Sequence, residues 1–170
     1  MNANKPSNED NLFMETLIEK RITLPIDQMN ERFEENIVRS IQRAYTGKCV
    51  EEGYIHPTSI KIQSYSAGKV GTQGTNVVVL FTCLACNPPS GLVVSCTVSD
   101  LTKAGVHAMC ASFDDPSIQP ISIYILRDHE FNSDMFDKVK KGDVIQARIL
   151  GARFELGDKC INAVAEFVEK

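Results

Sequence analysis

The segment CLACNPPSG, residues 83–91, separates two parts of the chain that have different sequence patterns. Cys83 and Cys86 have the spacing of half a zinc site, but zinc needs four converging ligands, usually from two close pairs. Cys96 and Cys110 are too far apart to form the second pair, and in a strand Cys83 and Cys86 point to opposite faces. We therefore predict no metal site here and interpret these cysteines as small buried side chains.

The composition describes an ordinary globular protein. A chain of 170 residues with 43% hydrophobic content can form one large or two small domains with a real core. The net charge of -4 argues against a protein that grips duplex DNA by neutralising phosphates. No apolar run has the length of a membrane span and no signal peptide is evident, so we expect no membrane insertion and read the six cysteines as free thiols in a reducing compartment.

The part before the segment reads as α+β. Residues 1–12 are mostly polar and predict a flexible tail, and Thr16–Leu24 reads as a strand that Pro25 ends. An amphipathic helix, stopped near Gly47, follows from apolar residues at steps of three and four, namely Ile26, Met29, Phe33, Ile37, Ile41 and Ala44. Alternation over residues 60–65 and the Val-rich residues 76–86 add strands, so residues 13–88 predict a small antiparallel sheet with one helix.

The part after the segment, residues 89–170, predicts a five-stranded barrel of the OB type. Five short strands are expected at residues 92–98, 105–109, 121–126, 143–150 and 160–165. Gly142-Asp143 predicts a turn before the fourth strand and Gly157-Asp158 a turn before the fifth. Pro88 and Pro89 then form a stiff joint between the two domains, because proline fixes φ and removes a backbone donor.

Catalytic motifs are missing from the sequence. His56, His107 and His129 lie in no nucleophile motif, and Asp114-Asp115 followed by proline reads as a solvated turn. No phosphate-binding loop or dinucleotide fingerprint occurs, so we expect no enzyme activity and no cofactor.

An OB barrel more often binds single-stranded nucleic acid, on aromatic and basic side chains. The groups available in this part are Lys103, His107, Tyr124, Arg127, Arg148, Arg153 and Phe154. For each of them a bland role remains open, because Tyr124 and Phe154 could belong to the core and the charges could serve solubility.

An ordered set of motifs resembles one family across residues 13–168. These motifs are RITLP (residues 21–25), GKCVEEGYI (47–55), SYSAG (64–68) and FTCLACNP (81–88) with Gly91. They resemble the stalk subunit of multisubunit DNA-directed RNA polymerases, the seventh subunit of the RNA polymerase II type. TKAGVHA (102–108) and ILGARFEL (149–156) are similar to the versions from large nucleocytoplasmic DNA viruses.

The resemblance implies a non-catalytic subunit of a viral polymerase complex. Residues 13–88 would be the tip domain that docks on the polymerase core near the clamp, and residues 89–170 would bind nascent single-stranded RNA. The docking residues would be Gly47, Lys48, Glu51, Glu52, Gly53, Tyr54, Tyr65 and Gly68. The RNA-binding residues would be Lys103, His107, Arg127, Arg148, Arg153 and Phe154.

The partners implied are the largest polymerase subunits, the small clamp-side subunit and, where the complex retains one, a helical stalk partner. The expected location is the cytoplasmic virus factory and the virion, with the host nucleus as the alternative. The competing hypothesis is a free-standing OB-fold RNA-binding protein that acts in translation or RNA decay.

Overall fold

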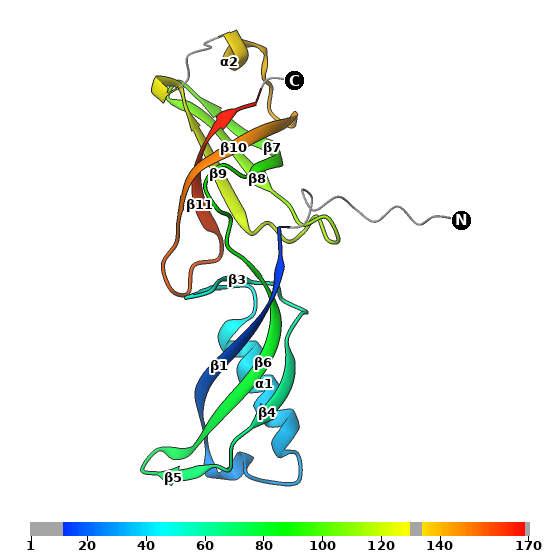
Figure 1. Ribbon diagram of the computed structural model, residues 1–170, viewed down its shortest axis with the longest axis vertical. Helices are drawn as coiled ribbons and strands as arrows, with labels where there is room; N and C mark the ends of the chain where they lie inside the picture. The colour runs from blue at the N-terminus through cyan, green and yellow to red at the C-terminus, as the bar shows by residue number, and fades with distance from the viewer. Residues whose placement is uncertain (1–11, 130–133, 169–170) are drawn as a thin grey trace, which may run out of the picture.

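The computed structural model describes residues 12–129 and 134–168, so residues 1–11 of the tail predicted at residues 1–12 lie outside them. The molecule is elongated, with a helix-covered sheet at one end and a closed barrel at the other (Figure 1). We call residues 12–86 the sheet unit and residues 93–168 the barrel. The fold is α+β with mostly strands, which confirms the predicted fold class.

One long strand, β6 (Gly74–Cys86), organises the sheet unit. Its β-branched residues favour an extended backbone, and its side chains alternate between buried and half-buried. On one side β6 pairs antiparallel with β1 (Met14–Leu24) along the whole length of β1. On its other side β6 pairs with three short strands, β3 (Gly53–Ile55), β4 (Lys61–Tyr65) and β5 (Lys69–Gly71). A further short strand, β2 (Cys49–Val50), pairs with β3.

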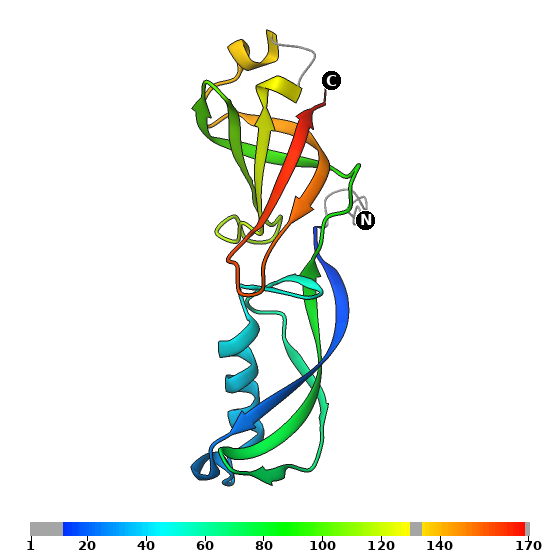
Figure 2. The same ribbon diagram turned by 90° about the vertical axis from the view of Figure 1, so that its left-hand side faces the viewer.

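The helix α1 (Phe33–Tyr45) covers one face of this sheet (Figure 2). Ile37 and Ile41 are fully buried against the inward side chains of β1 and β6, and each such burial stabilises the fold by about 2 kcal/mol. The prediction that six apolar residues form one buried helical face was wrong for the residues at both ends of that face. Ile26 and Met29 lie before the helix, in or next to the 3-10 turn η1 (Ile26–Gln28), and Ala44 is exposed.

The helix starts late because side-chain hydrogen bonds favour a turn before it. The Asn30 side chain accepts from the backbone N–H of Arg32 at 2.9 Å, and Asn36 Nδ2 donates to the carbonyl of Gln28 at 2.9 Å. Such local bonds compete with helical ones. Because the helix begins only at Phe33, Ile26 does not join its buried face and is 70% exposed.

The barrel is closed in the order β10-β11-β9-β8-β7, with β7 pairing back to β10. All neighbours are antiparallel except β9 and β11, which run parallel. The strands lie close to the predicted ones: β7 (Val93–Thr102), β8 (Gly105–Cys110), β9 (Ile121–Leu126), β10 (Val144–Arg153) and β11 (Ile161–Phe167). The 3-10 turn η2 (Arg127–His129) and helix α2 (Asp134–Lys138) lie between β9 and β10, as is typical of the OB type.

Two turns of the same construction flank β10. Gly142 and Gly157 both have φ of 91°, a backbone conformation that glycine adopts without strain. In each turn the aspartate that follows accepts, through Oδ2, a 2.8 Å bond from the backbone N–H three residues earlier, in Lys140 and Glu155 respectively. The turns predicted at Gly142-Asp143 and Gly157-Asp158 are therefore present.

The second of these turns attaches the barrel to the sheet unit. Cys49 N donates to the carbonyl of Asp158 at 2.7 Å, and Gly157 N donates to the carbonyl of Cys49 at 2.9 Å. Apolar packing reinforces the contact, because the buried side chains of Phe13, Tyr54 and Cys86 belong to the same cluster as the barrel core.

Candidate nucleic-acid interface

A stacked pair of rings forms the most distinctive feature of the barrel surface. His107 on β8 lies directly opposite Tyr124 on β9, and the rings stack with centroids 4.7 Å apart and planes 24° apart. Period-two alternation places both side chains on the outside of the barrel, where Tyr124 is 41% exposed. An exposed aromatic face of this kind can stack on a nucleic-acid base.

Two serines fix the orientation of the His107 ring. Ser99 Oγ donates to the carbonyl of His107 at 3.0 Å, and because a hydroxyl has one proton, it accepts from Nδ1–H at 2.8 Å. Nε2 forms a hydrogen bond with Ser122 Oγ, also at 2.8 Å. Both ring nitrogens of His107 are thus hydrogen-bonded to serines of neighbouring barrel strands, and the His107 ring stacks on one face of Tyr124. We call His107 and Tyr124 the ring platform.

Of the basic residues expected to bind RNA, Lys103 and Arg127 lie closest to the platform along the chain. Lys103 is exposed in the turn between β7 and β8, and Arg127 N donates to the carbonyl of Ala104 in the same turn at 2.9 Å. The Arg127 guanidinium also lies 4.9 Å from the Phe136 ring centroid and pairs with Asp137 at 3.8 Å. Two positive side chains therefore lie at one end of β8 and β9.

The other predicted RNA-binding residues lie on a different part of the barrel. Arg148 on β10 forms a 3.0 Å ion pair with Glu166. Arg153, at the end of β10, pairs with Glu155 at 3.6 Å, and both side chains are largely exposed. Phe154 is half-buried against the barrel core. The structure therefore does not gather all six predicted residues at one spot, and Tyr124, which sequence reasoning left undecided, joins the site through its stack with His107.

The predicted docking residues fall into two groups. The first group lies beside the barrel, in a loop and hairpin, and consists of Gly47, Lys48, Glu51, Glu52, Gly53 and Tyr54. Tyr54 is buried there, and Glu51 and Glu52 each accept a 3.5 Å bond from Lys20. Tyr65 and Gly68 lie toward the far end of the sheet unit, and Tyr65 donates to Glu34 at 2.7 Å.

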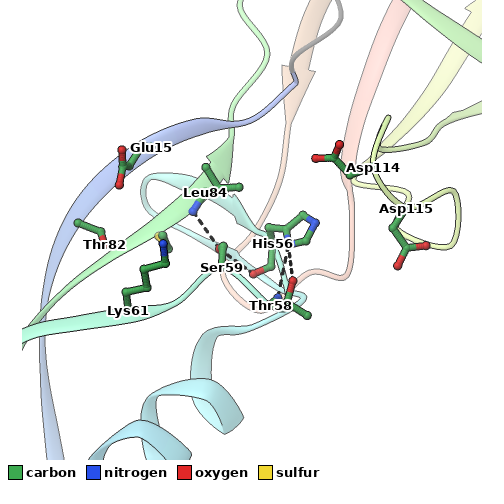
Figure 3. A pocket seen from close by; sticks show the side chains of 10 residues that line it. Glu15, His56, Thr58, Ser59, Lys61, Thr82, Leu84, Asp114 and Asp115 are labelled. Atoms are coloured by element: carbon green, nitrogen blue, oxygen red, sulfur yellow. Dashed lines mark hydrogen bonds between the residues drawn. The ribbon is translucent and has the colours of Figure 1, made fainter. Parts of the chain in front are cut away.

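A pocket of about 610 Å³ lies between the sheet unit and the barrel (Figure 3). Glu15 of β1 and Lys61 of β4 line it on one side, and Asp114 and Asp115 of the β8–β9 loop line it on the other. His56 Nδ1 bonds within its own turn to Thr58 at 3.3 Å. Asp115 accepts two bonds from Ser117, which lower the pKa of its carboxyl group. His56 and Asp115 therefore stabilise local turns.

Cys83 and Cys86 are both buried, but in different core clusters. Cys83 belongs to the cluster beneath α1, whereas Cys86 belongs to the barrel cluster, as expected of side chains on opposite faces of a strand. Among residues 12–129 and 134–168, no group of three or more His, Cys, Asp or Glu side chains is placed to hold a metal ion. No helix in this part of the chain is long and apolar enough to cross a membrane.

The fold and this surface define a class of protein: an OB-type barrel with an exposed ring platform, joined to a helix-covered sheet. No protein-family model matches the chain. The chain is 23% identical over 173 residues to a protein of Acanthamoeba polyphaga mimivirus named "putative DNA-directed RNA polymerase subunit", a match that covers 95% of this chain and 84% of that protein. It is thus similar, over nearly its whole length, to a viral polymerase subunit.

Proposed function

We propose that the protein is a non-catalytic stalk subunit of a viral DNA-directed RNA polymerase. The sheet unit docks on the polymerase core near the clamp, and the barrel contacts nascent RNA. The observation that carries the polymerase assignment is the likeness to the mimivirus polymerase subunit, because it spans both the sheet unit and the barrel. A shared barrel alone would indicate only a general binding fold.

The far end of the sheet unit offers a surface for docking. Ile26 is 70% exposed, Val70 on β5 is 81% exposed and Met29 is 41% exposed. These residues lie on η1 and β5 and their flanks, at the end of the molecule opposite the barrel (Figure 1). Apolar side chains gathered at an exposed end are typical of a protein interface. We name Ile26, Met29 and Val70 the apolar end and assign it to the polymerase core.

The ring platform supports the second half of the proposal. Stacking on an aromatic face tolerates any base, as contact with a changing transcript requires. The net charge of -4 implies weak, salt-sensitive binding by the isolated chain. Attachment to the polymerase would offset this weakness, because it raises the local concentration of RNA at the barrel.

The docking proposal can be tested by purification from infected cells. The tagged wild-type chain should recover the two largest polymerase subunits at near-equal stoichiometry. We expect Ile26→Asp and Val70→Asp to lose this recovery, because a carboxylate would be desolvated in the interface. Val144→Asp is the matched control, since Val144 is 69% exposed but lies on the barrel.

The competing function, a free-standing RNA-binding protein in translation or RNA decay, gives a different result in the same experiment. It predicts ribosomes or exonuclease subunits in place of the polymerase subunits, and that outcome would contradict the stalk assignment. The proposed location is the cytoplasmic virus factory and the virion, with the host nucleus as the alternative. Fractionation of infected cells with the polymerase subunits as markers distinguishes these locations.

A further inference from the structure

A row of outward residues crosses four barrel strands and starts at the ring platform. His107 lies opposite Tyr124, Tyr124 opposite Val164 on β11, and Val164 opposite Gly151 on β10. Val164 is 38% exposed, so the aromatic surface continues into an aliphatic one. The row ends at a residue with no side chain.

The fold itself gives no steric reason for glycine at position 151. Gly151 is not among the glycines with positive φ, and a Cβ built on it would meet no atom of the described chain within 4 Å. Gly53 differs, because there a Cβ would overlap the carbonyl of Cys86. Glycine inside a strand weakens it and often marks a bulge or the close approach of a ligand. A register shift between Ile149 and Gly151 accommodates Leu150 as an extra residue in β10, and the space above Gly151 is open.

A polar hollow lies next to this open space. It has a volume of about 310 Å³ and is lined by Arg153, Phe154, Glu155, Asp158 and Asn162. Asn162 lies opposite Arg153, one step of two residues from Val164 and Gly151 on the same outer face. The row therefore leads from a stacking surface to a pocket that contains an amide and a guanidinium, groups that hydrogen-bond bases and phosphates.

Positive charge lies at both ends of the row. Lys103 and Arg127 lie near the His107 end, and Arg153 lies at the Gly151 end. The Arg153 ion pair with Glu155 has side chains 86% and 77% exposed, so it competes weakly with another anion. The Gly151 end also holds the carboxylates of Glu155 and Asp158, so Arg153 is a single local cation there. A neutral middle with a cationic side chain toward each end fits a single strand whose bases stack in the centre while its phosphates reach those side chains.

We propose that this row is the path of single-stranded RNA across the barrel, and that Gly151 is where the RNA passes closest to the protein backbone. The proposal rests on the proposed contact with RNA and adds the path and its steric limit. Tyr124 stacks on one base, Val164 packs against the next sugar or base, and the hollow at Arg153 and Asn162 receives the nucleotide beyond Gly151.

The test adds bulk at position 151 of the full chain. Gly151→Val should weaken binding of a fluorescent oligouridylate of about eight nucleotides by about tenfold, measured by anisotropy. Gly151→Ala should show a smaller loss in the same direction. Ser95→Val is the matched control, because Ser95 is exposed on β7 opposite Gln146, away from the row. Circular dichroism and thermal unfolding should show both valine variants folded, since a Cβ at Gly151 meets open space and Ser95 is exposed.

Tyr124→Ala separates the RNA path from the RNA contact itself. If Tyr124→Ala weakens binding and Gly151→Val binds like the wild type, the path is wrong while RNA contact stands. If the wild type binds no RNA, the RNA contact itself is wrong and the path is overturned with it. If the wild type binds RNA and Tyr124→Ala binds equally well, the RNA does not use the ring platform and the path is overturned alone. The ordered loss from glycine to alanine to valine, with Ser95→Val unchanged, supports the path.

Discussion

Burial controls the chemistry of the cysteines around the CLACNPPSG segment. The Cys86 side chain is fully buried, and desolvation raises the pKa of its thiol from 9.0 to about 12. Burial raises the pKa of Cys96 to about 12 and that of Cys83 to about 11 in the same way. Thiols that stay protonated are poor nucleophiles and poor metal ligands. These cysteines therefore act as apolar core residues.

The raised pKa values predict a loss of stability in alkali. In the unfolded chain these thiols ionise near pH 9, whereas in the folded chain Cys86 ionises near pH 12. The stability is complete below pH 9 and falls as the pH rises toward 12, by about 1.4 kcal/mol per pH unit for each thiol. Urea unfolding at pH 8 and at pH 10.5 measures the fall.

Cys86→Ala identifies the thiol responsible. The variant loses stability at pH 8 because a buried sulfur is removed, but its deficit should shrink at pH 10.5, where wild-type folding must also keep that thiol protonated. A deficit that stays constant across this pH range would contradict the assignment.

The two Gly-Asp turns show how one local motif serves different purposes. Both are closed by an aspartate side chain, but only the turn at Gly157 forms backbone bonds to the sheet unit, through Cys49. The turn at Gly142 instead donates to the carbonyl of Val98 on β7, within the barrel. Their sequences are alike, and their neighbours differ.

We expect Asp158→Ala to loosen the attachment of the barrel. The substitution removes the 2.8 Å bond from Glu155 N and should cost about 1 kcal/mol. Hydrogen exchange at the amides of Cys49 and Gly157 should become faster. Asp143→Ala removes the equivalent bond from Lys140 N and should leave exchange at Cys49 unchanged. Equal effects of the two variants at Cys49 would show that the turn does not hold the two units together.

The elements follow the sequence pattern where burial alternates regularly, and depart from it where a side chain forms a local bond. Residues 121–126 were predicted as a strand and form β9 with those bounds. The helix departs from its pattern because Asn30 and Asn36 stabilise a turn that residue spacing does not reveal. As a result Ile26 and Met29, predicted as core, join the apolar end.

At the scale of the whole molecule, the sheet unit and the barrel share part of one core. Tyr54 comes from the sheet unit but packs within the barrel cluster, together with Phe13 and Cys86. The joint predicted at Pro88 and Pro89 would thus be accompanied by apolar packing and by the bonds of Cys49. Shared packing of this kind couples the unfolding of two units.

Tyr54→Ala should therefore destabilise both units. Removing this buried ring should cost about 3 kcal/mol, and hydrogen exchange should become faster in barrel strands as well as in the sheet. Tyr65→Ala is the control, because Tyr65 is 39% exposed and contacts Phe33 and Glu34 within the sheet unit. Faster exchange confined to the sheet unit in Tyr54→Ala would show that the two units unfold independently.

The sequence by itself determined the α+β class, the five barrel strands and the turns that flank β10, because period, glycine and proline act over a few residues. The sequence identified His107 and Lys103 as candidates for RNA binding, but it could not show which side chains lie close together. Only the tertiary structure decided that Tyr124 stacks on His107, that Val164 and Gly151 continue their row, and that Ile26 and Val70 form an exposed end. The physical reason is strand register: it brings together residues distant in sequence, and pairing between strands sets it.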